Sequence, residues 1–220
     1  MTFGAVFPRA MRPAFGPGLA AAAAAATWWT AGGATGAVAV YQPKGAASLA
    51  ASYTNLANPG TNNAAPGTAP TFNAATGWTF DGATQYLSSG VTGNTDAWSY
   101  LFRYSGATGA GFAFGSLEAN RLWGPRVTFG RIYFGNIFVD RGTLPAAGIY
   151  GQAGVNRYLD GASDGAFSSY SFTGTTALEI GRATGIATMY FNGSIQAVAI
   201  YNTTLTAPMV AAISTAMAAL

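Results

Sequence analysis

Short β-rich runs separated by tight turns fill the last two thirds of the chain. Aromatic residues occupy every second position from 98 to 104, so one face of a strand there is aromatic. The pairs Asp160-Gly161 and Asn192-Gly193 follow β-rich runs, and such pairs supply the positive φ angles that tight hairpins require. Helical patterns do not alternate with these runs. The chain is therefore predicted to be all-β, a sandwich or a barrel of roughly ten to twelve strands.

One helix is predicted at the C-terminus, over residues 207–219. Thr206 can cap it and Pro208 lies in its first turn. Its apolar residues recur at helical spacing and form one stripe, which predicts packing against the sandwich. Ahead of most strands, residues 54–76 are dense in Asn, Pro, Gly and Thr, and we expect a long loop with little regular structure there.

Residues 1–36 are predicted to form an N-terminal arm, and residues 37–220 the sandwich domain with its C-terminal helix. The arm starts as an extended stretch rich in Pro, Gly and Phe and continues as an Ala-rich helix from Leu19 to Thr30. Such a helix is marginal alone in water, so it needs a partner surface, either its own sandwich or another subunit. We interpret it as an unprocessed assembly arm; the alternative is a disordered tail. The apolar residues with this role are Phe15, Leu19, Trp28 and Trp29.

Composition excludes several classes of function. The chain has no cysteine and no histidine, so thiolate metal sites, cysteine nucleophiles and Ser-His-Asp triads are excluded. Only 8% of the residues are charged, against about 25% in an ordinary soluble domain, so the surface is mostly neutral and polar. The net charge of +3 is spread without basic runs, and no apolar stretch has the length of a membrane span. We therefore expect no nucleic-acid partner and no membrane span.

Catalysis by paired carboxylates, the chemistry of glycosidases, is not expected either. Retaining enzymes hold two carboxylates about 5 Å apart, which on a strand requires acids two or four positions apart. Only Asp160 and Asp164 have such a spacing, and a turn lies between them. The chain is predicted not to be an enzyme; the less favoured alternative is a degenerate glycosidase. Its seven acids are Asp81, Asp96, Glu118, Asp140, Asp160, Asp164 and Glu179.

Six short segments, most of them β-rich runs next to a turn, occur in a defined order along the chain. They are Gly77-Trp78-Thr79-Phe80-Asp81-Gly82, Gln85-Tyr86-Leu87, Tyr158-Leu159-Asp160-Gly161, Leu178-Glu179-Ile180-Gly181, Phe191-Asn192-Gly193-Ser194-Ile195 and Ala199-Ile200-Tyr201-Asn202. This order resembles the concanavalin-A-like lectin/glucanase group, which includes laminin-G-like and pentraxin-like jelly rolls, over roughly residues 37–206. The resemblance implies a two-sheet antiparallel jelly-roll sandwich. With the stretch 41–47, the chain is also similar to virion-associated proteins of tailed bacteriophages.

A mixture of aromatic and polar side chains in one hairpin region predicts a weak carbohydrate site. Sugar binding needs a flat apolar ring face together with a few hydrogen-bonding groups. The alternative is ordinary strand packing with solvated arginines, because aromatic residues are common in strands. The candidate residues are Trp123, Arg126, Arg131, Tyr133, Asn136 and Asp140.

Asp160 and Asp164 are weak candidates for calcium, which prefers about six to eight oxygen ligands. The resemblance implies calcium at the sandwich rim, since laminin-G-like and pentraxin-like domains often carry it there. The favoured alternative is that both aspartates make Asp-Gly turns. We therefore expect no cofactor and no metal.

The resulting functional prediction is a non-catalytic structural protein of a phage virion, either a head-decoration, a fibre or a tail component. Its lectin-like domain would bind cell-surface glycans weakly, and its arm would contact other virion or self subunits in a homo-oligomer. The alternative is a carbohydrate-binding, lectin-like module secreted by a bacterium, which would be extracellular. The virion setting is implied by resemblance, and fold alone does not establish function.

Overall fold

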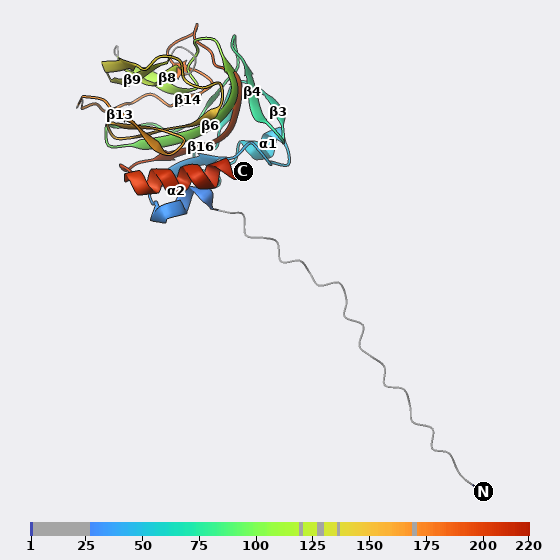
Figure 1. Ribbon diagram of the computed structural model, residues 1–220. Helices are drawn as coiled ribbons and strands as arrows, with labels where there is room; N and C mark the ends of the chain where they lie inside the picture. Colours follow the sequence, from blue (N-terminus) through green and yellow to red (C-terminus); the bar gives the residue numbers. More distant parts are fainter. Residues whose placement is uncertain (2–26, 119–120, 127–129, 136, 169–170) are drawn as a thin grey trace.

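Two facing β-sheets form the body of the protein. The computed structural model describes residue 1 and residues 27–118, 121–126, 130–135, 137–168 and 171–220. Within these residues sixteen strands make two eight-stranded sheets that stack as a sandwich, with short helices outside them (Figure 1). The prediction of an all-β, two-sheet antiparallel sandwich with a short C-terminal helix is confirmed.

The two sheets, A and B, are antiparallel throughout except for one short parallel pair in sheet B. Sheet A runs in the spatial order β13 (Ala162–Ala166), β12 (Asn156–Leu159), β11 (Gly148–Ala153), β6 (Ser99–Thr108), β16 (Asn192–Tyr201), β4 (Gly77–Asp81) and β3 (Thr71–Asn73), and β1 (Ala37–Tyr41) also pairs with β16. Sheet B runs in the order β10 (Ile137–Asp140), β9 (Arg131–Gly135), β8 (Arg121–Arg126), β7 (Phe114–Glu118), β14 (Glu179–Ile180), β5 (Tyr86–Ser88) and β2 (Ala65–Thr68), and β15 (Ala183–Thr184) pairs with β7 in parallel.

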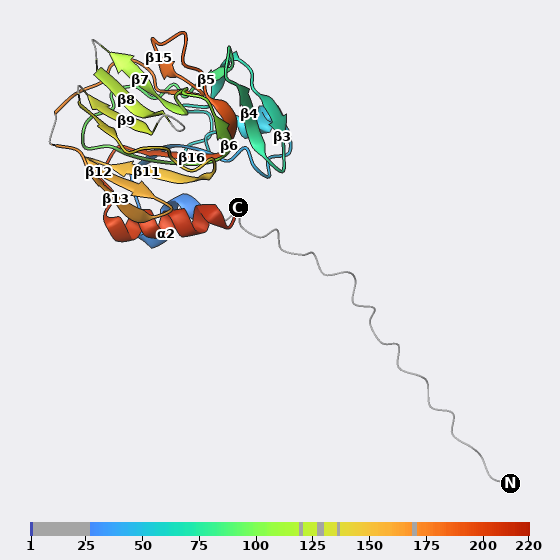
Figure 2. The ribbon, with the colours of Figure 1, turned by 45° about the horizontal axis from the view of Figure 1, so that its top comes forward.

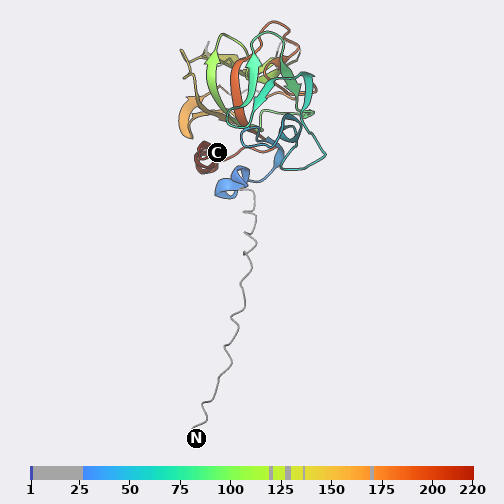
Figure 3. The same ribbon diagram turned by 90° about the vertical axis from the view of Figure 1, so that its right-hand side faces the viewer.

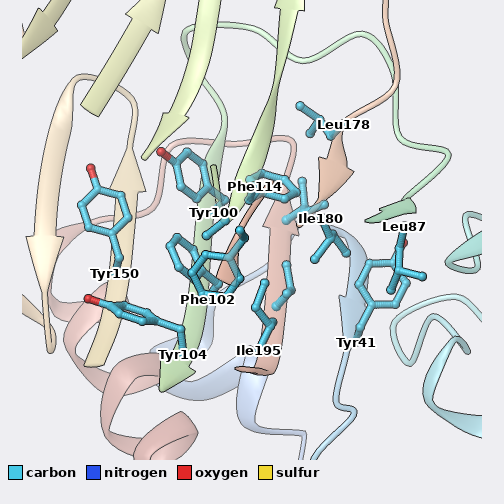
Figure 4. Close-up of a cluster of buried hydrophobic side chains, with 14 of the residues drawn as sticks. Tyr41, Leu87, Tyr100, Phe102, Tyr104, Phe114, Tyr150, Leu178, Ile180 and Ile195 are labelled. Carbon is cyan, nitrogen blue, oxygen red and sulfur yellow. The ribbon is translucent and has the colours of Figure 1, made fainter. Parts of the chain in front are cut away.

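The main core lies between the sheets and follows from the period-two pattern. Tyr100, Phe102 and Tyr104 alternate along β6 and are almost fully buried (Figure 4). Phe114 and Ile180 of sheet B belong to the same buried cluster. Burial of a large apolar side chain stabilises the fold by about 1.5–3 kcal/mol relative to exposure, so this layer holds the two sheets together.

The outer face of sheet A is covered as well. Leu101 lies in β6 between the inward-facing aromatic residues, and it is fully buried against a second apolar cluster. That cluster includes Val210, Ile213 and Met217 of α2 (Ala207–Ala218), which confirms the predicted stripe and its packing on the sandwich. Arg103 of β6 donates a hydrogen bond of 2.8 Å to the Met217 carbonyl in the last turn of α2. This bond gives a partner to a terminal carbonyl of the helix, whose last turn contains no basic residue.

A short 3-10 helix, η1 (Trp28–Gly33), lies beside α2 on this same face (Figures 2 and 3). Trp28 and Trp29 are only 3% and 9% exposed. The Trp28 indole donates to Gln42 at 2.9 Å, and the Tyr201 hydroxyl donates to the Trp29 carbonyl at 2.8 Å. Of the two partner surfaces that the sequence left open, these tryptophans pack on their own sandwich, and their role as assembly contacts stays a prediction.

The other predictions for the arm lie largely outside the described residues. Phe15 and Leu19 are among those not described, as is most of the predicted helix from 19 to 30. In the described part, η1 contains Gly32, whose φ of 68° is left-handed and interrupts the helical geometry. Although η1 lies within the predicted arm, it packs on sheet A and α2.

The predicted loop over residues 54–76 contains regular structure, which corrects that prediction. Strands β2 and β3 lie within it and pair with β5 and β4. Both are edge strands of three or four residues. A neighbouring strand supplies their backbone hydrogen bonds, so the polar composition of this segment does not prevent strand formation.

No helix of the described residues is long and apolar enough to cross a membrane.

Candidate functional site

The layers of the sandwich restrict where a ligand can bind. Sheet A is covered by sheet B on one face and by η1 and α2 on the other. The outer face of sheet B and the ends of the strands are the surfaces left for a ligand. Arg131, Tyr133 and Asp140, three of the predicted carbohydrate residues, lie on the first surface, and a hollow lies on the second.

The hairpin β9–β10 brings together three of the predicted carbohydrate residues. Arg131 and Asp140 are register partners, as are Tyr133 and Phe138. Both carboxylate oxygens of Asp140 accept hydrogen bonds from Arg131, at 2.6 and 2.7 Å, and these bonds lower the pKa of Asp140. The Arg131 guanidinium also lies 4.1 Å from the centre of the Phe138 ring. The polar groups of this hairpin are therefore engaged with one another, and Arg131 covers one face of the exposed ring.

Two of the other predicted residues are placed by their backbone in the neighbouring strand. Trp123 and Arg126 lie in β8, where the backbone register pairs them with Phe134 and Arg131. Asn136 lies outside the described residues.

A hollow of about 360 Å³ lies where three neighbouring strands of sheet A end. Strand β16 lies between β4 and β6 (Figure 3), and its first residue, Asn192, is the register partner of both Asp81 and Thr108. Ten residues line the hollow in three segments: Asp81 and Gly82, residues 108–111, and residues 188–190 with Asn192. We call this site the rim hollow. Its volume is within the range of about 300–1,000 Å³ that small-molecule sites occupy.

The turn after β4 builds one wall of the rim hollow. One carboxylate oxygen of Asp81 accepts hydrogen bonds from the backbone N–H groups of Ala83, Thr84 and Gln85, at 2.9, 2.9 and 3.2 Å. The other oxygen accepts a single bond, from the Thr84 hydroxyl at 3.0 Å. Burial raises the pKa of Asp81, but these hydrogen bonds outweigh it and lower the pKa to about 2. The carboxylate is therefore ionised and rigidly held.

Gly82 fits this turn for two reasons. Its φ of 74° is in the left-handed region, which L side chains rarely adopt. A Cβ atom at this position would also lie 2.9 Å from the Cβ of Asn192, closer than real contacts allow. The turn and the first residue of β16 are therefore in close contact.

Several polar groups of the rim hollow have no partner among the residues that the structure describes. Within the described part of the chain, the side-chain amide of Asn192 and the hydroxyls of Thr108 and Thr188 form no hydrogen bond. Each can therefore bond to a ligand. Met189 and Tyr190 supply apolar surface in the same lining. The site thus combines an aromatic residue with amide and hydroxyl groups that have no partner among the described residues.

Tyr190 is held in place from the side of sheet B. Its hydroxyl accepts a hydrogen bond of 3.0 Å from Arg182, and its ring lies 6.4 Å from that of Tyr86. Arg182 stacks over Tyr86 at 3.4 Å and is paired with Glu179, whose oxygens lie 2.5 and 3.2 Å from it. These contacts fix the ring before any ligand binds, which reduces the entropy lost on binding.

The calcium candidates are engaged with groups of the protein. Asp160 has a left-handed φ of 50° in its Asp-Gly turn, and its carboxylate accepts a hydrogen bond from the Ile149 N–H at 2.8 Å. Asp164 is ion-paired with Arg141, and Arg157 lies 3.8 Å from its second oxygen. Among the described residues there is no group of three acidic, His or Cys side chains that could hold a metal ion. The expectation of no cofactor stays a prediction.

Sequence reasoning missed the rim hollow. Its signals were present, because Asp81-Gly82 and Asn192-Gly193 are turn pairs and residues 106–111 are rich in glycine. Turn formation alone accounts for each of these signals, so none of them points to a shared site. The register that brings the three segments together could not be derived from them separately.

No family model and no curated protein matches this sequence. Solved structures do match the fold. Domain 4 of AbnA, a GH43 extracellular arabinanase from Geobacillus stearothermophilus in complex with arabinotriose, has a TM-score of 0.52 at 12% identity, over 81% of this chain and 98% of that chain. Trypanosoma rangeli sialidase in complex with sialic acid has a TM-score of 0.53 at 11% identity, over 81% of this chain.

A mutant of the same sialidase that displays trans-sialidase activity gives a TM-score of 0.53 at 12% identity, over 83% of this chain. The matched region is 32% and 33% of the two sialidase chains, so this chain spans about a third of their length. At these identities the likeness shows the fold. The protein is a β-sandwich domain with the architecture of that arabinanase domain and of one part of the sialidase. The resemblance to phage proteins gains no support from these structures.

Proposed function

We propose that this protein is a non-catalytic carbohydrate-binding module and that the rim hollow is its glycan site. The observation that carries the proposal is the set of unpaired polar groups, the Asn192 amide and the Thr108 and Thr188 hydroxyls, beside the fixed ring of Tyr190. Sugars present many hydroxyl groups and an apolar ring face, so they need this combination.

The structural neighbours are consistent with this proposal. The arabinanase domain was solved with arabinotriose, and the sialidase with sialic acid. Both are domains of carbohydrate-active proteins, and this chain spans nearly the whole of the first. An oligosaccharide of arabinose is therefore the first probe to test.

The absence of catalysis is part of the proposal. Its support is that each of five acids is held by the protein itself through hydrogen bonds or ion pairs, which leaves no free pair of carboxylates among them. These acids are Asp81, Asp140, Asp160, Asp164 and Glu179. Hydrolysis of a β-glucan or an arabinan that is lost on Asp160→Ala or Asp164→Ala would contradict this part.

Two settings remain for such a module. One is a structural component of a phage virion, in which the domain faces outward and binds host glycans; its support is the sequence resemblance and the low content of charge. The other is a secreted bacterial module. A self-assembled oligomer that is lost on removal of residues 1–26, measured by light scattering, favours the first setting, and an unchanged monomer favours the second.

The test of the binding function is a titration of the full chain with arabinotriose and a panel of other oligosaccharides, followed by calorimetry and by NMR chemical shifts. We expect saturable binding that weakens about tenfold in Asn192→Ala, because the amide supplies both a donor and acceptors. Asn58→Ala is the matched control, since Asn58 is exposed and is not part of the rim hollow. Lack of binding to every saccharide of the panel would overturn the proposal.

A further inference from the structure

The rim hollow has a local charge opposite to that of the whole chain. Asp81 is the only charged residue among the ten described residues that line it. The chain as a whole carries a net charge of +3. A ligand that enters the hollow therefore meets a carboxylate, although the protein overall attracts anions.

The geometry keeps this carboxylate ionised. Three backbone N–H groups and one hydroxyl donate hydrogen bonds to Asp81, and they hold its pKa at about 2. Protonation of Asp81 would weaken these bonds, so an acidic ligand cannot relieve the repulsion by sharing a proton at neutral pH. The negative charge is thus a fixed property of the site.

Arg182, which contacts Tyr190 of the lining, does not compensate for this charge. Arg182 donates to both oxygens of Glu179 and to the Tyr190 hydroxyl, and it stacks on Tyr86. Its charge is matched by Glu179, and its position behind Tyr190 is set by these contacts. It does not belong to the lining of the hollow.

We infer that the rim hollow selects uncharged sugar units and rejects acidic ones such as uronic acids, sialic acids and sulfated sugars. The inference rests on the proposed function and specifies the ligand class of the same site. The second oxygen of Asp81, which accepts only one hydrogen bond, accepts a sugar hydroxyl, and the Asn192 amide binds a neighbouring hydroxyl. The volume of about 360 Å³ suits one or two sugar units at the end of a chain.

The experiment compares matched pairs of ligands that differ only at C6 of the terminal sugar, which is a hydroxymethyl group in one member and a carboxylate in the other. Neutral oligosaccharides that end in galactose or glucose are titrated beside those that end in galacturonate or glucuronate, at low and high salt. We expect the neutral member of each pair to bind about tenfold or more tightly at low salt. We also expect added salt to strengthen binding of the acidic member alone, because screening weakens the repulsion.

Asp81→Asn tests whether the carboxylate is responsible. Asparagine can accept the same backbone hydrogen bonds, so the turn is kept while the charge is removed. We expect the preference for the neutral member to shrink at least severalfold, mainly because the acidic member binds better. The salt dependence of the unsubstituted chain gives an independent measurement if this variant does not fold.

Three results would overturn the inference, and they have different meanings. Equal or tighter binding of acidic sugars, with chemical-shift changes at Asn192, overturns the selectivity and leaves the glycan site intact. An unchanged preference in folded Asp81→Asn shows that the carboxylate is not the selector. Failure of every saccharide to bind overturns the proposed function, and the inference with it.

Discussion

The β9–β10 hairpin and the rim hollow have similar side chains but differ in how those side chains are used. In the hairpin, Arg131 donates to both oxygens of Asp140 and covers Phe138, so the polar and aromatic groups satisfy one another. In the rim hollow, the side-chain amide of Asn192 and two threonine hydroxyls have no partner in the described part of the chain, and Tyr190 belongs to the same lining. A mixture of aromatic and polar residues is thus not enough to identify a binding site. Unused hydrogen-bonding capacity in a concave place is the better criterion.

Of the substitutions that test this comparison, replacement of Tyr190 should cause the largest loss, a loss of glycan affinity. We expect Tyr190→Ala to weaken glycan binding by about 2 kcal/mol, roughly thirtyfold, because the site loses its ring face. Tyr190→Phe keeps the ring and loses only the contact with Arg182, so its effect should be much smaller. Tyr133→Ala in the hairpin is the control in a calorimetric titration. A larger loss in Tyr133→Ala than in Tyr190→Ala would move the glycan site to the hairpin.

Gly82→Ala tests the contact between the turn and β16. We expect it to lower the free energy of unfolding by about 1–2 kcal/mol, since it combines a left-handed φ with a clash against Asn192. Gly93→Ala is the matched control, because Gly93 has the same φ of 74° and no neighbouring atom within 4 Å. Urea unfolding measures the loss of unfolding free energy in each variant, and the difference between the two losses is the cost of the clash with Asn192. Equal losses would show that the clash is relieved without strain.

The Asp81 turn should make a smaller, pH-dependent contribution to stability. Its folded pKa of about 2 is below the usual value of 3.8, so the stabilisation is fully present above about pH 4 and is lost as the pH falls toward 2. We therefore expect the difference in unfolding free energy between the unsubstituted chain and Asp81→Asn to be constant from pH 7 to 5 and to shrink below pH 4. Urea unfolding as a function of pH measures it. A difference that grows on acidification would contradict the assigned hydrogen bonds.

Arg131→Ala should have the smallest effect of the four. Its ion pair with Asp140 is solvent-exposed, and such pairs contribute little to stability. We expect no measurable change in Tm or in the Kd for the best neutral glycan. A clear loss of glycan affinity, with Tm unchanged, would show that the hairpin also binds ligand.

Much of the fold could be predicted because its signals are local. Aromatic residues at every second position predicted β6 and its inward face, and the apolar stripe of residues 207–219 predicted α2 and its buried side. The tryptophans of η1 were less predictable. Their apolar character required a partner surface, but only the packed structure shows that α2 and sheet A provide it.

By itself, the sequence determined the alternation, the turns, the C-terminal helix and the absence of cysteine and histidine chemistry, because each depends on residue types at short spacings. The tertiary structure decided the rim hollow. Asp81, Thr108 and Asn192 are far apart in the chain, and they meet because β16 lies between β4 and β6 in one register. The same structure paired the groups of the β9–β10 hairpin and left those of the hollow free. Cross-strand register joins distant segments through long-range packing, and for that reason no local pattern could specify this site.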